Sequence, residues 1–542
     1  MSNAYFKVPE PINEPIKAYA PGSAEKAELK AKMAELKAQV IEVPVIIGGE
    51  EVRTGDTADM VIPHEHGHKL GTYHRAGEKE VLMAVEAALE AQKAWAVMPW
   101  EQRVAIFLKA ADLLAGPWRA TINAATMLGQ SKTAFQAEID SACELIDFWR
   151  FNAYYMAELM KDQPYSPAGM WNRVEYRPLE GFVFAVTPFN FTSIAGNLPT
   201  SPAIVGGVAL WKPASSSVYS GYFLMKLLEE AGLPKGVINF IPGSGAKVGN
   251  PVMANPNLSG IHFTGSTAVF QEMWKTVGDN ISNYKYYPRI VGETGGKDFI
   301  FAHNSADVDA LVVAAIRGAF EYQGQKCSAA SRMYIPKSIW PEFKEKYVAQ
   351  MADMKVGDPE DFTNFMCAVI DKAAFKSITA YIDYTKESTD AEFITGGGYD
   401  DSKGYFVEPT TIVTTDPKYK TMEEEIFGPV LTIYVYEDEK FDEALDLCDS
   451  TSMYALTGAI WGQDRYALIK MADRLRNAAG NFYTNDKPTA AVVGQQPFGG
   501  GRASGTNDKA GSAMNLLRWM SVRTMKETFY PPKDWRYPFM GE

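Results

Sequence analysis

The chain has 542 residues, of which 46% are apolar and 22% are charged. This composition is typical of a folded globular protein and excludes collagen-like, fibrous and disordered classes. The 66 acidic residues outnumber the 53 basic ones, and the formal net charge is −13. Since a field of that sign repels phosphate backbones and anionic lipids, we expect neither a nucleic-acid partner nor a membrane partner.

The cysteine content indicates a reducing compartment. Four cysteines, at positions 143, 327, 367 and 448, are too few and too scattered for a disulfide scaffold. The N-terminal segment lacks the apolar core of a signal peptide, and it carries Glu10 and Glu14 but no Arg, unlike a mitochondrial transit peptide. The longest apolar run, Pro202–Trp211, is about half of the ~20 residues that a membrane-spanning helix needs. We expect a cytoplasmic protein, or one of the mitochondrial matrix if a transit peptide has already been removed.

The first third of the chain predicts mainly helices. Ser23–Gln39 is rich in Ala, Glu and Lys and is most simply a solvated amphipathic helix, with partner binding as the alternative. Val43–Tyr73 indicates short strands and turns. Apolar residues then recur at helical spacing in Glu78–Trp95, and a longer helical stretch follows over Thr133–Met160.

From Gly181 onward, short apolar runs alternate with helical stretches such as Tyr219–Ala231. The runs are GFVFAVT, GVALWK, VINFI and GIHFT. Buried strands that alternate with helices imply βαβ units and a parallel sheet, which binds ligands at the carboxyl ends of its strands. A second α/β series begins near Asp298, has a helix over Asp307–Tyr322 and continues to about Phe498.

Two glycine-containing turns are candidates for a cofactor site. PGSGAKVG (Pro242–Gly249) resembles a dinucleotide fingerprint whose third glycine comes one residue late, and a tight turn without a ligand explains it about as well. FTGST (Phe263–Thr267) is a better phosphate cradle, because Gly265, Ser266 and Thr267 open a helix directly after a strand. The alternative for this motif is an ordinary Ser/Thr helix cap.

Three polar residues are candidates for chemistry. Cys327 stands in GQKCSAASR, Glu293 in VGETGGKD and Asn190 in TPFNFTS. A thiol can act as a nucleophile, a carboxylate between glycines as a base, and an amide as an oxyanion donor. Taken singly, each also fits a plain structural role: a small buried apolar group, a surface acid and a turn-forming Asn. The histidine-rich HEHGH (His64–His68) lies on a strand-like segment with no second cluster, so we expect no metal site.

Six motifs together resemble the NAD(P)-dependent aldehyde dehydrogenase family. TPFNF, KPAS (Lys212–Ser215), FTGST, GETGGK, GQKCSAASR and EEIFGPV (Glu424–Val430) occur in the order and approximate spacing of that family, over roughly residues 40 to 530. The resemblance implies an α/β protein of the aldehyde dehydrogenase fold, with a Rossmann-like cofactor domain, an α/β catalytic domain and a small oligomerisation element. It also implies Cys327 as nucleophile, Glu293 as general base, and Asn190 with the Cys327 N–H as oxyanion hole.

The same resemblance implies NAD as cofactor. It assigns cofactor contacts to Thr187, Lys212, Ser215, Gly265, Ser266, Thr267, Ala268, Val269, Glu425 and Phe427. Many NAD-strict relatives carry Glu three residues after the lysine, where this chain has Ser215. A hydroxyl would not repel a 2′-phosphate as a carboxylate would, so we expect some tolerance of NADP.

Within the family, the stretch GQQPFGGGRASGTNDKAG (Gly494–Gly511) resembles the branch that oxidises L-glutamate γ-semialdehyde, formed from 1-pyrroline-5-carboxylate, to L-glutamate in proline catabolism. The resemblance implies a substrate pocket formed by Glu144, Phe191, Ser328, Ala490, Ala491 and Phe498. The loop that usually holds the substrate carboxylate reads Gly then Ser or another small residue, and here Ala490 and Ala491 stand in it. Ala491 lacks a hydroxyl, and Ala490 would resist a positive φ. The alternatives are another semialdehyde dehydrogenase, such as one for succinate semialdehyde, a CoA-acylating relative, which the presence of Glu293 disfavours, and a catalytically silent protein of the same fold.

We divide the chain into four parts. These are an N-terminal arm and helix (1–40), a cofactor-binding domain (41–292), a catalytic domain (293–500) and a C-terminal return with an oligomerisation tail (501–542). Residues 165–180 also contribute to oligomerisation, because Ala168–Pro178 and the aromatic tail (Trp519, Phe529, Tyr530) have no obvious core of their own. We expect these aromatic side chains to be exposed and to pair with another subunit in a homodimer or higher oligomer.

Overall fold

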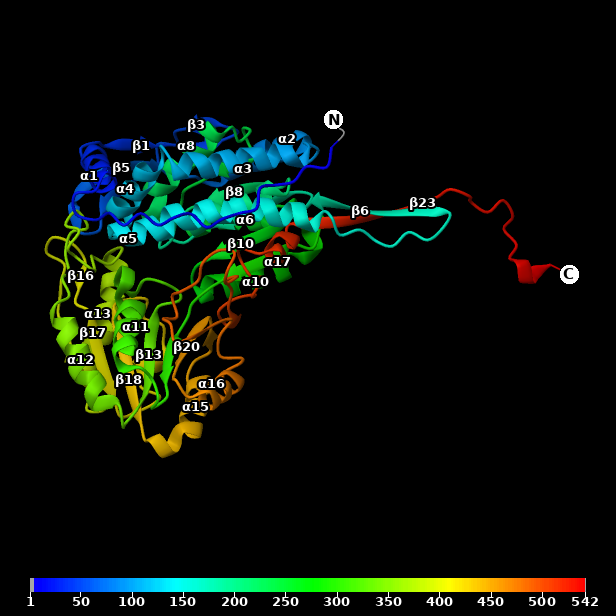
Figure 1. Ribbon diagram of the computed structural model, residues 1–542. Coiled ribbons are helices and arrows are strands. Elements are labelled where there is room, and N and C mark those ends of the chain that lie inside the picture. Colours follow the sequence, from blue (N-terminus) through cyan, green and yellow to red (C-terminus); the bar gives the residue numbers. More distant parts are fainter. Residues whose placement is uncertain (1–3, 542) are drawn as a thin grey trace.

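The structure, a computed structural model, describes residues 4–541. Each half of the chain is built around a seven-stranded sheet against which helices pack (Figure 1). The strand order is β11-β10-β7-β8-β9-β2-β3 in the first sheet and β14-β17-β18-β13-β12-β20-β21 in the second. The predicted α/β class is confirmed. Parallel pairs predominate in both sheets, but β2–β3, β2–β9 and β14–β17 are antiparallel, so the sheets are mixed.

The first sheet places the ends of four neighbouring strands along one edge. Its strands are β2 (Val45–Ile47), β3 (Glu50–Val52), β7 (Phe182–Val186), β8 (Val208–Lys212), β9 (Ile238–Phe240), β10 (Leu258–Thr264) and β11 (Arg289–Glu293). Strands β11, β10, β7 and β8 pair in parallel, with Thr264 opposite Glu293 and Val186 opposite Lys212. Because parallel strands end at the same edge, the residues that follow them lie close together.

The helices of the first half include three that the sequence predicts with nearly the same bounds, over residues 23–39, 78–95 and 219–231. The helices of this half are α1 (Ala24–Lys37), α2 (Glu78–Trp95), α3 (Trp100–Ala115), α4 (Arg119–Gln130), α5 (Ala134–Ala137), α6 (Glu144–Leu159), α7 (Thr192–Ile204), α8 (Val218–Ala231), α9 (Gly245–Ala254) and α10 (Thr267–Asp279). The bounds of α2 agree with the prediction. Helices α9 and α10 both open directly after a strand, with Ser244 and Ser266 at their N-caps.

The prediction of one continuous helix over Thr133–Met160 is wrong in one respect. A π-helical segment, Glu138–Cys143, lies between α5 and α6. The Glu138 side chain is fully buried and ion-paired with Arg119. A π-helical insertion adds a residue to the turn and changes which side chains face inward, an adjustment that the apolar periodicity of the sequence does not reveal.

A separate three-stranded sheet, in the order β1-β5-β4, carries the histidine-rich motif. Its strands are β1 (Ile41–Val43), β4 (Thr57–Ile62) and β5 (Glu65–His74). The ring of His64 lies 2.9 Å from the Ser131 hydroxyl, and burial lowers the His64 pKa to about 3. No group of three or more His, Cys, Asp or Glu that could hold a metal occurs among residues 4–541.

The second sheet has a separate apolar core on each face. Its strands are β12 (Asp298–Ala302), β13 (Ala330–Pro336), β14 (Ala391–Thr395), β17 (Thr410–Thr414), β18 (Val430–Tyr436), β20 (Thr457–Trp461) and β21 (Asn481–Thr484). The side chains of β12 alternate as expected for a strand buried on both sides: Phe299 and Phe301 belong to one core, and Ile300 and Ala302 to the other. The accompanying helices are α11 (Val308–Phe320), α12 (Trp340–Ala352), α13 (Lys372–Lys386), α14 (Lys420–Glu423), α15 (Phe441–Ser450) and α16 (Arg465–Arg474).

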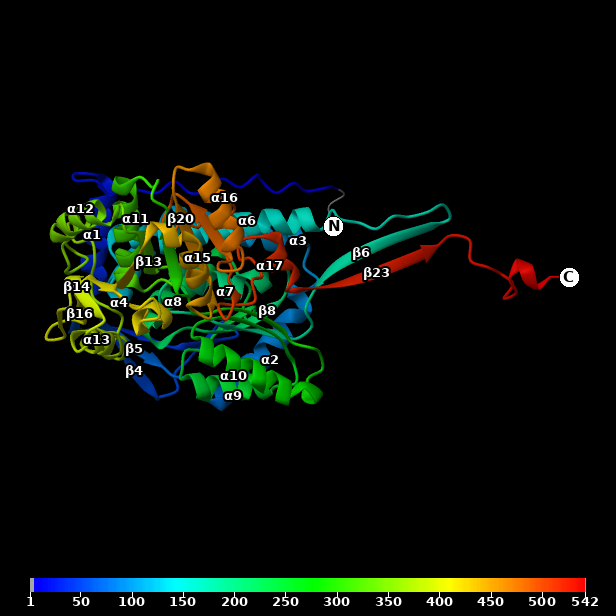
Figure 2. The ribbon, with the colours of Figure 1, turned by 90° about the horizontal axis from the view of Figure 1, so that it is seen from below.

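A two-stranded antiparallel sheet projects from the body in both ribbon views (Figures 1 and 2). It pairs β6 (Met170–Pro178) with β23 (Met520–Thr528) and leads into an extended C-terminal tail. Phe529 and Tyr530 are exposed as predicted, but the prediction for Trp519 is wrong. Its side chain is 1% exposed and packs on His262. The short helix α17 (Ala513–Leu517) returns the chain to the first sheet before β23 begins.

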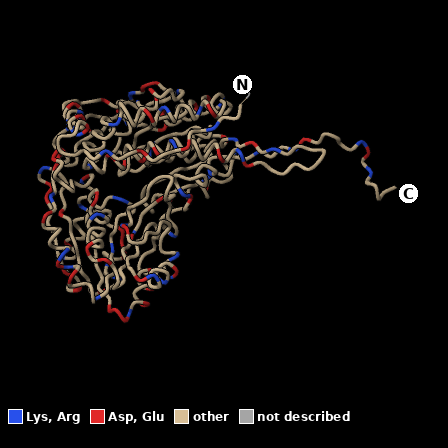
Figure 3. Tube along the Cα trace, in the orientation of Figure 1, with Lys and Arg blue, Asp and Glu red and all other residues tan. Residues whose placement is uncertain are grey.

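The surface carries charges of both signs. Figure 3 shows Lys and Arg interspersed with Asp and Glu over both halves of the molecule. Within the described part of the chain, no helix combines the length and the apolarity required to cross a membrane.

Candidate active site

A cavity of about 470 Å³ contains most of the predicted catalytic and substrate residues. Residues from both halves of the chain line it. Among them are Glu144, Phe191, Glu293, Cys327, Ser328, Ala490, Ala491 and Phe498. The structure therefore brings together side chains that are separated by more than 300 positions in the sequence.

The loop before Cys327 has an uncommon backbone conformation. Tyr322 and Gln323, which end the predicted helix early, have φ values of 51° and 55°. The Tyr322 hydroxyl donates to the Gln130 carbonyl at 2.9 Å, and the Gln323 amide donates to the Ser131 carbonyl at 3.0 Å. Left-handed residues other than glycine cost energy, and these buried hydrogen bonds fix the loop that presents Cys327 to the cavity.

The Cys327 thiol is 9% exposed and lies among carboxyl groups. Burial raises its pKa well above the ordinary value of 9.0, and the neighbouring Asp298, Glu293, Glu425 and Glu144 raise it further. The neutral thiol is therefore the resting form. A reacting thiolate would have to form by proton transfer within the cavity.

Glu293 ends strand β11 and is enclosed by the glycine-rich C-terminal loop. Its Oε2 atom accepts a hydrogen bond from the Gly500 N–H at 2.9 Å. A Cβ atom at Gly499 or Gly505 would come within 3.1 Å or 2.9 Å of the Glu293 carboxylate oxygens. Burial raises the Glu293 pKa well above 4.5, which favours the neutral acid. The sequence analysis did not identify the Gly500 donor, although the run of glycines at 499–501 signalled a close backbone approach.

Asn190 is buried but does not line the cavity. Its Nδ2 atom donates to the Gln325 carbonyl at 3.0 Å, two residues before Cys327. An amide group has two N–H donors, so this bond leaves one of them free to act elsewhere. The oxyanion role of Asn190 stays a prediction.

Predicted cofactor residues lie along the carboxyl edge of the first sheet. Thr187 follows β7 and accepts a hydrogen bond from the Trp211 indole at 2.9 Å. The buried Lys212 ends β8, and its Nζ atom donates only to the adjacent Pro213 carbonyl, at 3.2 Å. Burial lowers the Lys212 pKa to about 8. Ser215, three residues on, is exposed.

The turn between β10 and α10 contains a further set of predicted contacts, namely Gly265, Ser266, Thr267, Ala268 and Val269. The Gly265 N–H donates to the backbone carbonyl of Glu293 at 3.2 Å, which joins the turn to the end of β11. Val269 is an exposed apolar residue. At Gly245, the first residue of α9, an added Cβ would meet no atom within 4 Å. Exposed Val269 thus leaves an apolar surface open on the first turn of α10.

Glu425 and Phe427 approach this region from the second half of the chain. Glu425 Oε1 accepts from the Gly296 N–H at 2.9 Å, and an added Cβ at Gly295 would clash with the carboxylate. Burial raises the Glu425 pKa. Phe427 has a φ of 55°, and its ring packs edge-on against Phe189 at 5.9 Å. A bulky residue in the left-handed region is uncommon and fits a constrained functional position.

The cavity also has a buried ionic network that the sequence analysis missed. Lys132 pairs with Asp140 at 2.7 Å, Lys326 lies 3.4 Å from Asp140 and 3.5 Å from Glu321, and Lys487 lies 3.6 Å from Glu321. When all five groups are ionised, the three ammonium groups and two carboxylates carry a net charge of +1. The network surrounds the Phe191 ring, with the Lys132 Nζ atom 4.4 Å from its centroid.

The remaining substrate residues line the same cavity. Glu144 begins α6 and accepts from the Ser193 hydroxyl at 2.6 Å, and burial together with Asp140 raises the Glu144 pKa to about 8. Neither Ala490 nor Ala491 has a positive φ. The turn therefore does not require glycine at position 490, contrary to the concern raised by the sequence.

Comparison with known proteins identifies the class. The sequence pattern of the aldehyde dehydrogenase family matches residues 51–525. The chain belongs to this family.

Several similar proteins within the family carry the same name. The chain is 55% identical to the mitochondrial delta-1-pyrroline-5-carboxylate dehydrogenase of Dictyostelium discoideum, over 99% of this chain and 97% of the relative. It is 49% identical to the human mitochondrial enzyme of that name, over 97% and 94%. The crystal structure of the Mycobacterium tuberculosis enzyme bound with NAD superposes with a TM-score of 0.97, at 52% identity and 100% coverage of both chains. The Thermus enzyme with bound NAD gives a TM-score of 0.90 at 32% identity, over 96% of this chain and 99% of that one.

The raised pKa of Cys327 predicts its reactivity toward alkylating agents. Below that pKa the thiolate fraction rises about tenfold for each pH unit, so labelling of Cys327 by iodoacetamide should rise by about that factor between pH 7 and pH 8. Peptide mass spectrometry measures the rate at each cysteine. Cys367 and Cys448 serve as internal controls, because both are fully buried and should stay unlabelled in the folded protein. Fast labelling of Cys327 that does not change with pH would contradict the neutral resting thiol.

Proposed function

We propose that this protein oxidises L-glutamate γ-semialdehyde, the open form of 1-pyrroline-5-carboxylate, to L-glutamate with NAD as cofactor. The observation that carries the proposal is the cavity itself, which holds a thiol, a carboxyl group and an ionic network with an excess of ammonium groups. The names of the similar proteins, delta-1-pyrroline-5-carboxylate dehydrogenases, support the same substrate.

The thiol is required because an aldehyde does not release hydride readily. Addition of the Cys327 sulfur to the carbonyl carbon forms a tetrahedral thiohemiacetal whose oxygen carries negative charge. The Cys327 N–H and the free Asn190 amide hydrogen are the donors we assign to that oxygen. Loss of hydride then leaves a thioester on Cys327, and bound NAD supplies the hydride acceptor.

Hydrolysis of the thioester is assigned to Glu293. Its carboxylate removes a proton from water, the resulting hydroxide attacks the thioester carbonyl, and the Cys327 thiol leaves with the acid product free. Burial favours the neutral Glu293 and so makes its carboxylate a stronger base once ionised. The Gly500 N–H hydrogen bond holds the carboxyl group in place.

The residues along the first sheet fit a dinucleotide. The Lys212 ammonium is buried with a single carbonyl partner, and hydroxyl groups of a ribose would satisfy its remaining donors. The free N–H groups of the turn before α10 suit a phosphate, and exposed Val269 suits an adenine face. Glu425 is the carboxyl group we assign to the second ribose. Exposed Ser215 puts no negative charge beside Lys212, so NADP is tolerated as well.

The substrate's remote end carries an ammonium and a carboxylate. The net positive charge of the ionic network, which includes Lys326, complements the carboxylate, and the N–H groups of Ala490 and Ala491 are further donors. Phe191 and Phe498 flank the carbon chain. A cavity with such unsatisfied polar groups disfavours an uncharged aldehyde.

We further propose that the protein forms a homodimer or a higher oligomer through the projecting two-stranded sheet of β6 and β23. Strand β23 continues into a tail in which Tyr530, Trp535, Tyr537 and Phe539 are all exposed by 66% or more. An isolated pair of strands is marginally stable in water, so we expect a second copy of the chain to pack against this element. The four free cysteines of the protein suit a reducing compartment, which we take to be the cytoplasm or the mitochondrial matrix.

A panel of aldehydes assayed with NAD and with NADP tests the proposed function. We expect kcat/KM for 1-pyrroline-5-carboxylate to exceed that for propanal or hexanal by at least about tenfold, because the uncharged aldehydes leave the polar groups of the cavity unsatisfied. NAD should be preferred, with measurable NADP activity. Equal or greater efficiency with succinate semialdehyde would assign the protein to the other semialdehyde branch.

Glu293→Gln separates the two chemical stages. The variant should keep a rapid first-turnover burst of NADH absorbance but lose most steady-state turnover, because hydride leaves before water is activated. In the parent, turnover should rise with pH through the raised Glu293 pKa, since only the carboxylate accepts the proton. Cys327→Ala is the matched control and should show neither burst nor turnover. A Glu293→Gln variant with a normal steady-state rate would remove Glu293 from the mechanism.

The assembly is checked by light scattering at micromolar concentration. We expect a mass of at least twice the 59.9 kDa of one chain. A truncation after residue 528 should weaken association, because it removes the exposed aromatic side chains of the tail. A fully active monomer would refute the proposed assembly.

A further inference from the structure

The N-terminal arm, residues 4–23, forms part of the catalytic cavity. It runs along the body across α6 in Figure 1, and Asn13, Glu14 and Ile16 line the cavity together with Cys327 and Glu293. The proposed reaction gives this segment no role. Its contacts indicate one.

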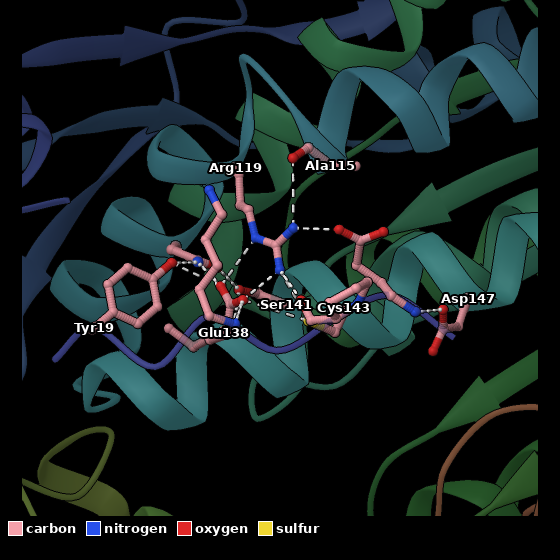
Figure 4. Close-up of polar contacts among 12 residues, drawn as sticks. Tyr19, Ala115, Arg119, Glu138, Ser141, Cys143 and Asp147 are labelled. Atoms are coloured by element: carbon pink, nitrogen blue, oxygen red, sulfur yellow. Dashed lines mark hydrogen bonds and ion pairs between the residues drawn. The ribbon is translucent and has the colours of Figure 1, made fainter. Parts of the chain in front are cut away.

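A buried carboxylate holds the arm in place (Figure 4). Glu138, in the π-helical segment, accepts hydrogen bonds from the Tyr19 hydroxyl and the Lys17 N–H, both at 2.8 Å. Arg119 and the Asn123 amide donate to the same carboxylate from α4. Burial alone would raise the Glu138 pKa, but these donors lower it below the ordinary value, so the group is a carboxylate in the folded protein. The arm is therefore attached to the body through a buried, ionised acceptor.

A second set of bonds fixes the arm close to the cavity. The Glu14 N–H donates to the Asp147 carboxylate at 2.8 Å, and the Glu14 carboxylate pairs with Arg119 at 2.5 Å and with Arg150 at 2.8 Å. Asp147 lies on α6 one turn after Glu144. The position of residues 13 and 14 is thus tied to the wall of the cavity that carries Glu144.

Asn13 connects that wall to the loop of Ala490 and Ala491. Its Nδ2 atom donates to Asp147 and to the Val493 carbonyl, both at 2.8 Å, and its Oδ1 atom accepts from the Gln495 amide at 2.9 Å. One side chain therefore uses both amide N–H donors and its carbonyl oxygen to join three segments that are far apart in the sequence.

The loop is also held at its other end. The Lys487 ammonium donates to the Thr489 carbonyl at 2.9 Å and to its hydroxyl at 3.0 Å, and it faces Glu321 of the ionic network. Ala490 and Ala491 lie between the two attachments and have no polar side chain of their own. The positions of their backbone N–H groups in the cavity therefore depend on Lys487 on one side and on Asn13 on the other.

We propose that Asn13 is a positioning residue for substrate binding: it holds the loop of Ala490 and Ala491 against α6 and so makes the cavity selective for aldehydes that carry a carboxylate. The inference rests on the proposed function, because it assigns the substrate carboxylate to this loop. Asn13 takes no part in the chemistry at Cys327. Its loss should therefore weaken binding of the charged substrate and leave the reaction of an uncharged aldehyde unchanged.

The test compares Asn13→Ala with Ile12→Ala, a neighbouring control whose side chain is 78% exposed. For Asn13→Ala we expect KM for 1-pyrroline-5-carboxylate to rise about five- to tenfold, with kcat and the kcat/KM for hexanal within about twofold of the parent. Gln495→Leu removes one partner of the same side chain and should act in the same direction. In the double variant, KM should rise by less than the product of the two single fold-changes, since both substitutions disrupt the same connection.

Hydrogen exchange of the peptide that spans residues 487–496 gives a readout that does not depend on the substrate. We expect faster exchange in Asn13→Ala than in the parent and in Ile12→Ala. Unchanged exchange, or an equal loss of activity toward charged and uncharged aldehydes, would overturn the positioning role. A parent enzyme that does not oxidise 1-pyrroline-5-carboxylate would instead refute the proposed function, and the exchange result would still decide the role of Asn13. The melting temperature identifies any variant that fails to fold.

Discussion

Burial of the acidic groups around Cys327 is the constraint on which the rest of the site depends. Glu144, Glu293, Asp298 and Glu425 all lie close enough to Cys327 to raise its pKa, and burial raises the pKa of each of these four acids. Four ionised carboxylates could not share such a space without severe repulsion. Their tendency to stay neutral allows them to lie close to the thiol.

The two sheets supply different parts of this environment. The first sheet contributes strand ends and the turns that follow them, which include Lys212, the Gly265 turn and Glu293. The second contributes the loop before β13, whose left-handed residues present Cys327, and the segment that carries Glu425. Because neither half contains both the thiol and the turn next to Glu293, the site exists only where the halves meet.

Much of the fold could be predicted from the sequence because its signals are local. Continuous apolar runs identified the buried strands, and apolar spacing gave the bounds of α2. The π-helical segment could not be predicted, because it depends on Glu138 meeting Arg119 and the N-terminal arm. Trp519 was expected at the surface because nothing in its neighbourhood shows that His262 covers it.

The site shows the same division. The motifs around Cys327, Glu293 and Phe498 identified residues that the structure places in one cavity. Their chemical roles, the cofactor contacts and the domain limits stay predictions. The ionic network of Lys326 and the contacts of Asn13 could not be predicted from the sequence. A single Lys or Asn forms no recognisable motif, and the partners of these two residues lie far along the chain.

The hydrogen bond between Asn13 and Gln495 spans 482 positions, and this separation bears on how the protein is made. During synthesis the arm leaves the ribosome long before the loop that it must meet. Closing so long a loop is slow compared with forming local helices and hairpins. The cavity wall that contains Asn13 is therefore completed at the end of folding, and a chain interrupted anywhere before residue 495 would lack a finished pocket even if both sheets had formed.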